Sequence, residues 1–219
     1  MISLTEENYL KALFNLSLEN GEVRVSELSN RLGIKKPTVT SMMKALAKKN
    51  LVQYESYRPI KLTDSGKKEA SSIIRKHRLT EMFLVEKMGF GWENVHEIAE
   101  QVEHIHAPEF FERMNELLGK PTFDPHGSPI PDQNGQFATL EQRKLSDCHV
   151  GEKLTLSAVV NTSVEFLTFL NKHDIKLGIH IQILSIEPFD RSITIRYGDR
   201  GSQILSHTVC ERLLVEKAI

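Results

Sequence analysis

The sequence predicts a mainly α-helical N-terminal part, made of a winged helix-turn-helix and a helical dimerisation domain, followed by a small C-terminal SH3-like β-barrel. Three observations support this fold class. Two helical patterns joined by a glycine turn and followed by a hairpin occupy the first third of the chain. Longer helical patterns with apolar stripes come next. Short alternating strand patterns, separated by turns, fill the last third.

The helix-turn-helix is predicted from the first 50 residues. Residues 5–19 have the apolar spacing of an amphipathic helix, with Thr5 as the expected N-cap. A short helix over residues 26–32 is followed by Gly33, which makes the turn. A second helix opens near Lys36 and Pro37, because proline is favoured in the first turn of a helix.

The wing and a helical bundle follow. Residues 51–54 and 60–62 read as two strands around a turn, which predicts a β-hairpin wing. Helical patterns then cover residues 65–90, 92–106 and 108–118. Their stripes of isoleucine, leucine, phenylalanine and methionine predict a dimerisation bundle.

The second half of the chain changes character. Residues 119–146 are rich in proline and glycine and predict an extended linker. Strand patterns follow, interrupted by one helix over residues 163–172. We therefore expect a winged helix-turn-helix over residues 1–72, a helical domain with its proline-rich linker over residues 73–140, and an SH3-like domain over residues 147–219.

Charge is distributed unevenly along a chain whose net charge is only −1. Residues 1–76 carry 14 Lys and Arg against 8 Asp and Glu, a net charge of +6, and residues 77–219 have a net charge of −7. A basic head on an acidic body indicates a domain that binds a polyanion. The alternative is an asymmetry that arose by chance.

The start of the second helix is where a helix-turn-helix meets DNA bases and phosphates. That region offers lysines, short hydroxyls and a proline, and the wing adds a tyrosine and an arginine. The predicted DNA-binding residues are Lys35, Lys36, Pro37, Thr38, Thr40, Ser41, Tyr57 and Arg58. The alternative is that the lysines form an ordinary solvated helix face, which the wing and the basic charge disfavour.

Histidine and glutamate recur at helical spacing in two adjacent segments. Spacings of three and four residues place them in two groups, each able to converge on one ion. The groups are Glu100, Glu103 and His104, and His77, Glu81 and His96. Carboxylate and imidazole ligands without a thiolate suit Mn²⁺ or Fe²⁺ and also accept Zn²⁺ or Co²⁺. The alternative for any one pair is a surface salt bridge.

Several function classes are disfavoured. The two cysteines, Cys148 and Cys210, make neither a disulfide framework nor a thiolate metal cage. Glu100 stands where a zinc protease helix that begins at His96 needs its second histidine, so we do not expect an enzyme. A cytoplasmic protein is expected, because the N-terminus lacks a signal-peptide pattern and no apolar run approaches the roughly 20 residues of a membrane span.

The order of these motifs resembles the diphtheria toxin repressor family of iron- and manganese-dependent regulators. The motifs are the winged helix-turn-helix, then RKHRLTE, VHEIAEQVEH and DPHGSPIP, then a β-rich domain. The resemblance spans the chain and is most specific over residues 1–131. The C-terminal sequences DIKLGIHIQIL and EPFDRSITIRYG resemble the SH3-like or FeoA-like domain of longer members. It implies a homodimeric repressor that binds operator DNA when loaded with metal and controls metal uptake genes.

The resemblance also implies ligand sets. The primary site falls on Glu100, Glu103 and His104 with Asn8 of the first helix, and the ancillary site falls on His77, Glu81 and His96. Manganese-sensing members have a glutamate where iron-sensing members have a cysteine, so Glu100 favours Mn²⁺ over Fe²⁺. Lys11 stands where some manganese sensors have a second acid. Asn161 and Glu165 are candidates for an extra ancillary ligand.

The expected mechanism is thermodynamic linkage. Metal at the primary site, reaching the first helix through Asn8, fixes the DNA-binding domain against the dimerisation bundle. Both recognition helices of the dimer then meet successive major grooves. Two alternatives remain: a winged-helix regulator of an organic ligand with structural His and Glu residues, and a metallohydrolase with a DNA-binding appendage.

Overall fold

The structure, a computed structural model, describes residues 2–139, 141–198 and 201–218, without the side chains of residues 19 and 20. The chain divides into two compact units. Unit 1 comprises Met1–Thr80, Ile98–Lys120 and Ile130–Phe137, and unit 2 comprises Glu81–Glu97, Pro121–Pro129 and Ala138–Ile219.

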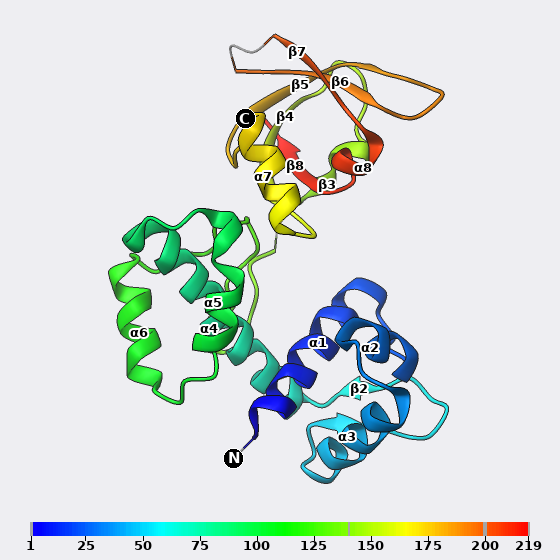
Figure 1. Cartoon of the computed structure of the whole chain (residues 1–219), viewed down its shortest axis with the longest axis vertical. Helices are drawn as coiled ribbons and strands as arrows, with labels where there is room; N and C mark the ends of the chain where they lie inside the picture. The colour runs from blue at the N-terminus through cyan, green and yellow to red at the C-terminus, as the bar shows by residue number, and fades with distance from the viewer. Residues whose placement is uncertain (1, 140, 199–200, 219) are drawn as a thin grey trace. The chain divides into compact units, whose positions relative to one another are not determined.

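Unit 1 begins with the predicted winged helix-turn-helix, which is confirmed. Its elements are α1 (Leu4–Asn20), α2 (Val25–Leu32), α3 (Lys36–Lys48), β1 (Val52–Gln53) and β2 (Lys61–Leu62). Figure 1 shows the three helices in blue beside the cyan hairpin. Gly33 ends α2 with a φ of 66°, in the left-handed region that favours glycine, and so makes the turn into α3.

The start of α1 differs from the prediction. Ser3, rather than Thr5, is the N-cap: its Oγ accepts a hydrogen bond from the Glu6 N–H at 3.3 Å. Glu6 Oε2 in turn accepts from the Ser3 N–H at 2.8 Å, which completes a capping box. With this register the helix turns Leu10 and Leu13 fully inward.

The core of this domain lies where α1, α2 and α3 meet. Leu28 of α2 and Val39, Met43 and Leu46 of α3 are fully buried in one cluster with Leu10. Each such side chain stabilises the fold by about 1.5–3 kcal/mol relative to an exposed one. This packing fixes the face that α3 presents outward.

The helices that follow are α4 (Asp64–Met88), the 3₁₀ turn η1 (Trp92–Asn94), α5 (His96–Val102) and α6 (Pro108–Leu117). The single helix predicted over residues 92–106 is therefore wrong. A 3₁₀ turn and a shorter α-helix occupy that segment instead, whereas the predicted break before Pro108 is present: Ala107 has a φ of −137° and a ψ of 87°, outside the helical region. Among the described residues, no helix is both long and apolar enough to cross a membrane.

Unit 2 contains an antiparallel sheet of six strands in the order β3-β8-β4-β5-β6-β7. The strands are β3 (Arg143–Lys144), β4 (Lys153–Val159), β5 (His180–Ile186), β6 (Ile193–Tyr197), β7 (Ser202–Leu205) and β8 (Leu213–Lys217), with η2 (Leu145–Asp147), α7 (Val164–Lys172) and α8 (His207–Cys210) between them. Register shifts in β4 and β5 bend the sheet, whose curl is visible in Figure 1. The predicted small C-terminal β domain is confirmed.

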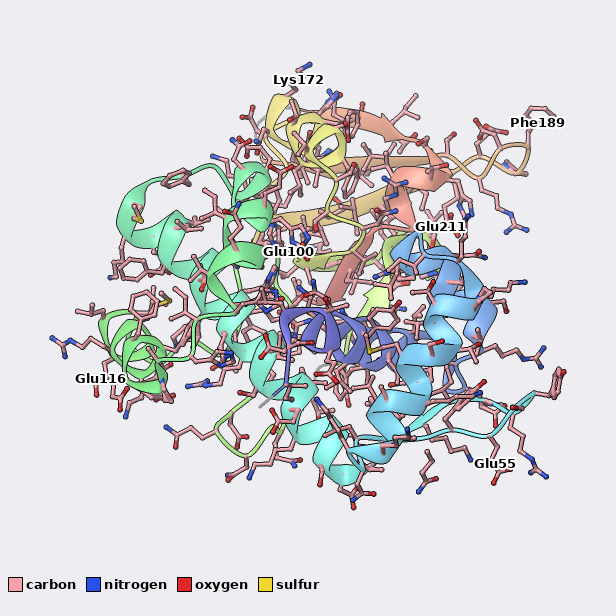
Figure 2. The ribbon with its side chains drawn as sticks, turned by 60° about the horizontal axis from the view of Figure 1, so that its bottom comes forward. Glu55, Glu100, Glu116, Lys172, Phe189 and Glu211 are labelled. Atoms are coloured by element: carbon pink, nitrogen blue, oxygen red, sulfur yellow. The ribbon has the colours of Figure 1, made fainter. Side chains whose placement is uncertain are left out.

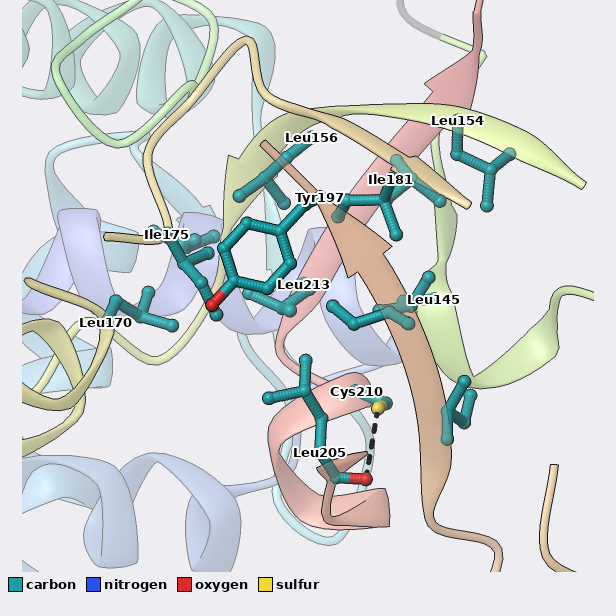
Figure 3. Packing of buried hydrophobic residues seen from close by; sticks show 14 of the residues in the cluster. Leu145, Leu154, Leu156, Leu170, Ile175, Ile181, Tyr197, Leu205, Cys210 and Leu213 are labelled. Atoms are coloured by element: carbon teal, nitrogen blue, oxygen red, sulfur yellow. Dashed lines mark hydrogen bonds between the residues drawn. The ribbon is translucent and has the colours of Figure 1, made fainter. Parts of the chain in front are cut away.

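The core of the β domain is continuous across the curved sheet. Figure 3 shows Leu156, Ile181 and Leu213 packed around the ring of Tyr197. The Tyr197 hydroxyl donates to the carbonyl oxygen of His173 at 2.6 Å, which satisfies the one polar atom of that ring. β8, which the sequence did not predict, lies between β3 and β4 and supplies Leu213 to this core.

The predicted linker is packed rather than extended. Residues 121–129 belong to unit 2 and residues 130–137 to unit 1. Phe137 stacks on Phe14 of α1 with ring centroids 5.5 Å apart. Arg75 of α4 donates to the carbonyl oxygen of Pro131 at 2.9 Å. Residues 130–137 therefore pack against α1 and α4.

The two cysteines give a prediction for the folded state. Both thiols are buried, and burial raises the pKa of Cys210 to about 12 and also raises that of Cys148. Because the thiolate is the reactive species, we expect a disulfide reagent at pH 8 to leave both thiols unmodified in the native protein. Both should react in guanidinium chloride. Rapid modification of Cys210 without denaturant would contradict this burial.

Candidate functional site

The outward face of α3 carries the predicted DNA-binding residues. Lys36, Pro37, Thr38 and Ser41 are exposed, as is Lys35 just before the helix. Thr40 is half-buried. The opposite face holds the buried residues of the core. Hydrophobic packing therefore leaves the lysines and hydroxyls of the first two turns available to a ligand.

The wing lies beside the start of α3. Tyr57 at its tip is fully exposed and has a φ of 67°, and Arg58 pairs with Glu55 at 3.1 Å. Figure 2 shows Glu55 on the wing, away from the helices. A hollow of about 500 Å³ is lined by both elements; its lining residues are Arg24, Val25, Ser26, Lys36, Thr40, Tyr54, Ser56, Tyr57 and Arg58. Sequence reasoning missed Arg24 and Tyr54, although Arg24 directly precedes α2.

A second group of polar residues joins α1 to the end of α5. We call it the α1–α5 cluster, and it consists of Glu7, Lys11, Glu100, Glu103 and His104. Lys11 Nζ donates to Glu100 Oε1 at 3.0 Å and to Glu103 Oε1 and Oε2 at 2.6 and 2.9 Å. The Lys11 side chain is 14% exposed, and that of Glu103 is completely buried. Glu100 lies on α5, beside α1 in Figure 2.

Glu103 has further partners. The His77 Nδ1–H donates to Glu103 Oε2 at 2.5 Å, and Lys76 Nζ donates to the Glu103 carbonyl oxygen at 3.0 Å. The buried carboxylate is therefore bonded by one ammonium group and one imidazole, and a second ammonium group bonds the main-chain carbonyl of the same residue. A buried carboxylate without such partners would strongly destabilise the fold.

The contact from α1 to His104 is made by Glu7 and not by Asn8. His104 Nδ1 lies 2.5 Å from Glu7 Oε2, and Glu7 is buried. Asn8 is exposed on the helix. The residue predicted as the α1 ligand is thus one position away from the side chain that faces the cluster.

The α1–α5 cluster does not fit a divalent ion. Glu100, Glu103 and His104 come together as predicted, but the ammonium of Lys11 bonds the carboxylate oxygens that would have to coordinate the metal. An ammonium has only donors, and an ion bound at the same oxygens would be repelled by it. Lys11 is the residue that decides the chemistry of this cluster.

A third group gathers around Glu81 of α4, and we call Glu81, His96, Asp124 and His126 the Glu81 cluster. His96 Nδ1 lies 3.2 Å from Glu81 Oε1, and His126 Nδ1 lies 3.7 Å from Glu81 Oε2. One ligand atom from each of Glu81, Asp124 and His126 lies within 4.8 Å of the others. Glu81, Asp124 and His126 are buried, whereas the His96 side chain is 57% exposed.

The ring of His126 is oriented as a metal ligand requires. Its Nε2–H donates to the Trp92 carbonyl oxygen at 2.9 Å, which leaves Nδ1 facing Glu81. A second ring nitrogen bonded to a carbonyl is the usual arrangement behind a ligating histidine. Burial lowers the pKa of His126, but the carboxylates of Glu81 and Asp124 outweigh burial, so that its pKa is raised. The Glu81 cluster, with nitrogen and oxygen donors and an exposed histidine at its edge, fits a divalent ion.

The loop that carries Asp124 and His126 is held tightly. Asp124 Oδ1 accepts hydrogen bonds from the backbone N–H groups of His126 and Ser128, both at 2.9 Å. Gly127 has a φ of 85°, and a Cβ there would lie 2.2 Å from the Ser157 carbonyl oxygen of β4. Sequence reasoning did not assign Asp124 or His126 to a site, because their spacing in a proline- and glycine-rich loop has no helical period.

The remaining predicted ligands are placed as follows. His77 lies in unit 1, one turn before Glu81 on the continuous helix α4, so the two share a helix face. Asn161 and Glu165 are exposed in unit 2. Bonding to its own backbone N–H and to Ser163, at the start of α7, lowers the pKa of Glu165. Within the described residues, Glu165 belongs to no close group of three such ligand atoms.

Three family models match successive parts of the chain. The N-terminal DNA-binding domain of iron-dependent repressors matches residues 1–60, and the metal-binding and dimerisation domain of the same repressors matches residues 63–132. The FeoA domain model matches residues 143–217. Together they cover the helix-turn-helix, the segments that carry the clusters, and the β domain.

Individual proteins are similar as well. The iron-dependent repressor IdeR of Mycobacterium tuberculosis is 33% identical over 127 residues, which are 58% of this chain and 55% of that protein; the match thus spans about half the length of this relative. A solved manganese-dependent transcriptional repressor in complex with manganese has a TM-score of 0.87 and 28% identity, covering 97% of this chain and 100% of that chain. ScaR with bound Cd²⁺ has a TM-score of 0.80 and 31% identity, covering 97% and 99%.

The loop around Gly127 yields a prediction for stability. We expect Gly127→Ala to lower the free energy of unfolding by about 2 kcal/mol or more, because the added Cβ overlaps the Ser157 carbonyl in addition to straining the backbone. Gly178→Ala is the matched control: its φ is 84°, but its Cβ would meet nothing within 4 Å. Urea unfolding followed by circular dichroism measures both. Equal losses in the two variants would show that the loop is not held against β4.

Proposed function

Because the chain belongs to the diphtheria toxin repressor family of metal-dependent transcriptional repressors, we propose that it binds operator DNA as a homodimer when a divalent metal is bound, and so controls metal uptake genes. The observation that carries this proposal is the combination of two features. One is an outward α3 and wing on a basic domain, and the other is the Glu81 cluster. We also propose that the chain has three domains: a winged helix-turn-helix over residues 1–72, a helical domain with its proline-rich linker over residues 73–140, and an SH3-like domain over residues 147–219.

The DNA-binding part of the proposal rests on exposure and charge. The residues of α3 that face outward are lysines, hydroxyls and a proline, which suit phosphates, base edges and thymine methyl groups. In a dimer, two such helices read half-sites about one helical turn apart. Exposed Phe110 and Leu117 on α6 are suited to an apolar dimer interface, and the family model over residues 63–132 is one of a dimerisation domain.

Manganese is the metal we favour, with Fe²⁺ as the alternative and Zn²⁺ or Co²⁺ as ions that bind in vitro. Glu81, Asp124, His96 and His126 would hold the ion. The set contains oxygen and nitrogen donors and no thiolate, and both cysteines are buried in the β domain. The manganese complex among the similar structures supports this choice. Iron remains the alternative because the matching family models are those of iron-dependent repressors.

Control by metal follows from the elements that carry the ligands. When bound, the ion supplies positive charge to the buried Glu81 carboxylate. His96 is the first residue of α5, and α5 leads directly to Glu103 and His104, which contact α1. A constraint on His96 therefore bears on the helix that positions the α1–α5 cluster. Such coupling is typically about 1–3 kcal/mol, and by reciprocity DNA tightens metal binding by the same amount. We propose a cytoplasmic regulator without enzymatic activity.

The only tryptophan of the chain reports on the proposed metal site. Trp92 stacks on His126 with ring centroids 5.8 Å apart. We expect Mn²⁺, which is paramagnetic, to quench Trp92 fluorescence in a saturable way, and Glu81→Gln to remove the quenching at the same concentrations. Glu86→Gln, on an exposed residue of the same helix, is the control. Saturable quenching that survives Glu81→Gln would place the ion elsewhere.

DNA binding is tested with a duplex selected from a random library in the presence of Mn²⁺. A chelator should weaken binding about 5- to 150-fold in a mobility-shift assay. Lys36→Ala should weaken binding and reduce the slope of log K against log salt by about one unit, because one phosphate contact is lost. Thr38→Ala should also weaken binding.

The control for these variants is Lys67→Ala on α4, which removes the same charge from an exposed residue outside α3 and the wing. It should leave the affinity for the selected duplex nearly unchanged. Equal affinity with Mn²⁺, with Fe²⁺ and with the chelator would refute metal control even if the DNA-binding surface is correct.

A further inference from the structure

We propose that Lys11 is a fixed counter-cation of Glu100 and Glu103, so that the α1–α5 cluster binds no divalent ion and metal control is exerted through the Glu81 cluster alone. The second half of this proposal rests on the function proposed above. The first half rests only on the contacts of Lys11.

The ammonium group of Lys11 has an acceptor for each of its hydrogen-bond donors. Lys11 Nζ has three N–H donors, and three carboxylate oxygens lie within 3.0 Å of it: Glu100 Oε1, Glu103 Oε1 and Glu103 Oε2. These are the distances of charge-assisted hydrogen bonds. Each donor therefore has a partner, and both oxygens of Glu103 are engaged by the same ammonium group.

Further positive and donor groups surround Glu103. Lys76 Nζ binds its carbonyl oxygen at 3.0 Å, and the His77 imidazole binds Oε2 at 2.5 Å. A divalent ion at the Glu103 carboxylate would have to displace Lys11 and would also compete with the His77 imidazole for Oε2. The charge of the carboxylate is already balanced by side chains of the protein itself. Unlike a bound metal ion, these side chains cannot be removed by a chelator.

Burial keeps Lys11 in place. Its side chain is 14% exposed, on a helix whose neighbouring residues Leu10 and Ala12 are buried in the core of unit 1. The Glu103 side chain has no exposed surface. Withdrawal of the ammonium into solvent would leave a buried carboxylate without its main partner. This state is unfavourable unless another cation takes its place.

The consequence concerns how α1 is attached to α5. Lys11 bonds Glu100 and Glu103, and Glu7 bonds His104, so protein side chains alone connect the first helix of the DNA-binding domain to the end of α5. The attachment that the family resemblance assigns to a primary-site metal is made here by an ion pair. Removal of metal would therefore leave this connection intact.

The test counts Mn²⁺ ions bound per protomer by the full chain. Equilibrium dialysis against MnCl₂ is read by elemental analysis of bound metal and by electron paramagnetic resonance of the free ion. We compare the unchanged chain with Lys11→Gln, Glu100→Gln and the matched control Lys49→Gln. Lys49 also pairs with a buried glutamate of α1, Glu6, at 2.8 Å, but lies outside the cluster.

We expect Lys11→Gln to bind one more Mn²⁺ per protomer than the unchanged chain, because the carboxylates are freed for the metal. Glu100→Gln and Lys49→Gln should bind the same number as the unchanged chain. The proposal is overturned if Glu100→Gln binds one Mn²⁺ fewer, or if folded Lys11→Gln gains none.

A variant in the Glu81 cluster tests the proposed function separately from the proposed role of Lys11. Glu81→Gln should bind no Mn²⁺, since Lys11 blocks the remaining carboxylates. If Glu81→Gln binds as many ions as the unchanged chain, the Glu81 cluster is not the metal site. The comparison between Lys11→Gln and the unchanged chain still decides the role of Lys11.

Lys11→Gln can fail to fold because it leaves Glu103 without its partner, and circular dichroism shows whether it does. In that case Glu100→Gln tests whether the α1–α5 cluster binds metal. The Glu100 side chain is 50% exposed, so the protein should tolerate this change. An ion that binds Glu81→Gln and is lost in the double variant Glu81→Gln/Glu100→Gln would overturn the proposal. Absence of any such ion would support it.

Discussion

Two buried glutamates impose the constraint around which the metal-binding part of this chain is organised. Glu103 has no exposed surface and Glu81 is 3% exposed, and each carboxylate must be balanced by positive or donor groups. For Glu103 the balance comes from Lys11 and His77. For Glu81 it comes from His96 and His126. The contacts that connect α1 to α5, and those that hold the loop around His126 near α4, follow from this requirement.

Pairing a buried carboxylate with a lysine and pairing it with histidines have different chemical consequences. An ammonium group is positively charged and has no lone pair. A carboxylate paired with it therefore needs no metal ion to balance its charge. A deprotonated imidazole offers a lone pair, so a carboxylate paired with histidines can exchange protons for a metal ion. The Glu81 cluster can respond to metal for this reason. The α1–α5 cluster, in contrast, holds two helices together whether or not metal is present.

The helices and strands were predictable where local periodicity determines them. The helix-turn-helix followed from apolar spacing, Gly33 and Pro37, because these act within a few residues. The break before α6 was predicted, but the separate turn η1 and the end of α5 at Val102 were missed, because the apolar pattern over residues 92–106 continues through both. β8 was missed because its partners, β3 and β4, are distant in sequence. His126 was missed for the same reason: its proximity to Glu81 is a property of tertiary structure.

Family resemblance predicts positions, whereas chemistry depends on the side chains that occupy them. The resemblance placed a metal ligand on α1 at Asn8, but a shift of one residue rotates a helix position by about 100°, and it is Glu7 that faces His104. One turn further along, Lys11 points at Glu103. A neutral residue there would have left the carboxylates to a metal. A lysine instead contributes the cation itself, so a single side chain changes a predicted metal site into a buried ion pair, within an arrangement of helices similar to that of a solved manganese-dependent repressor.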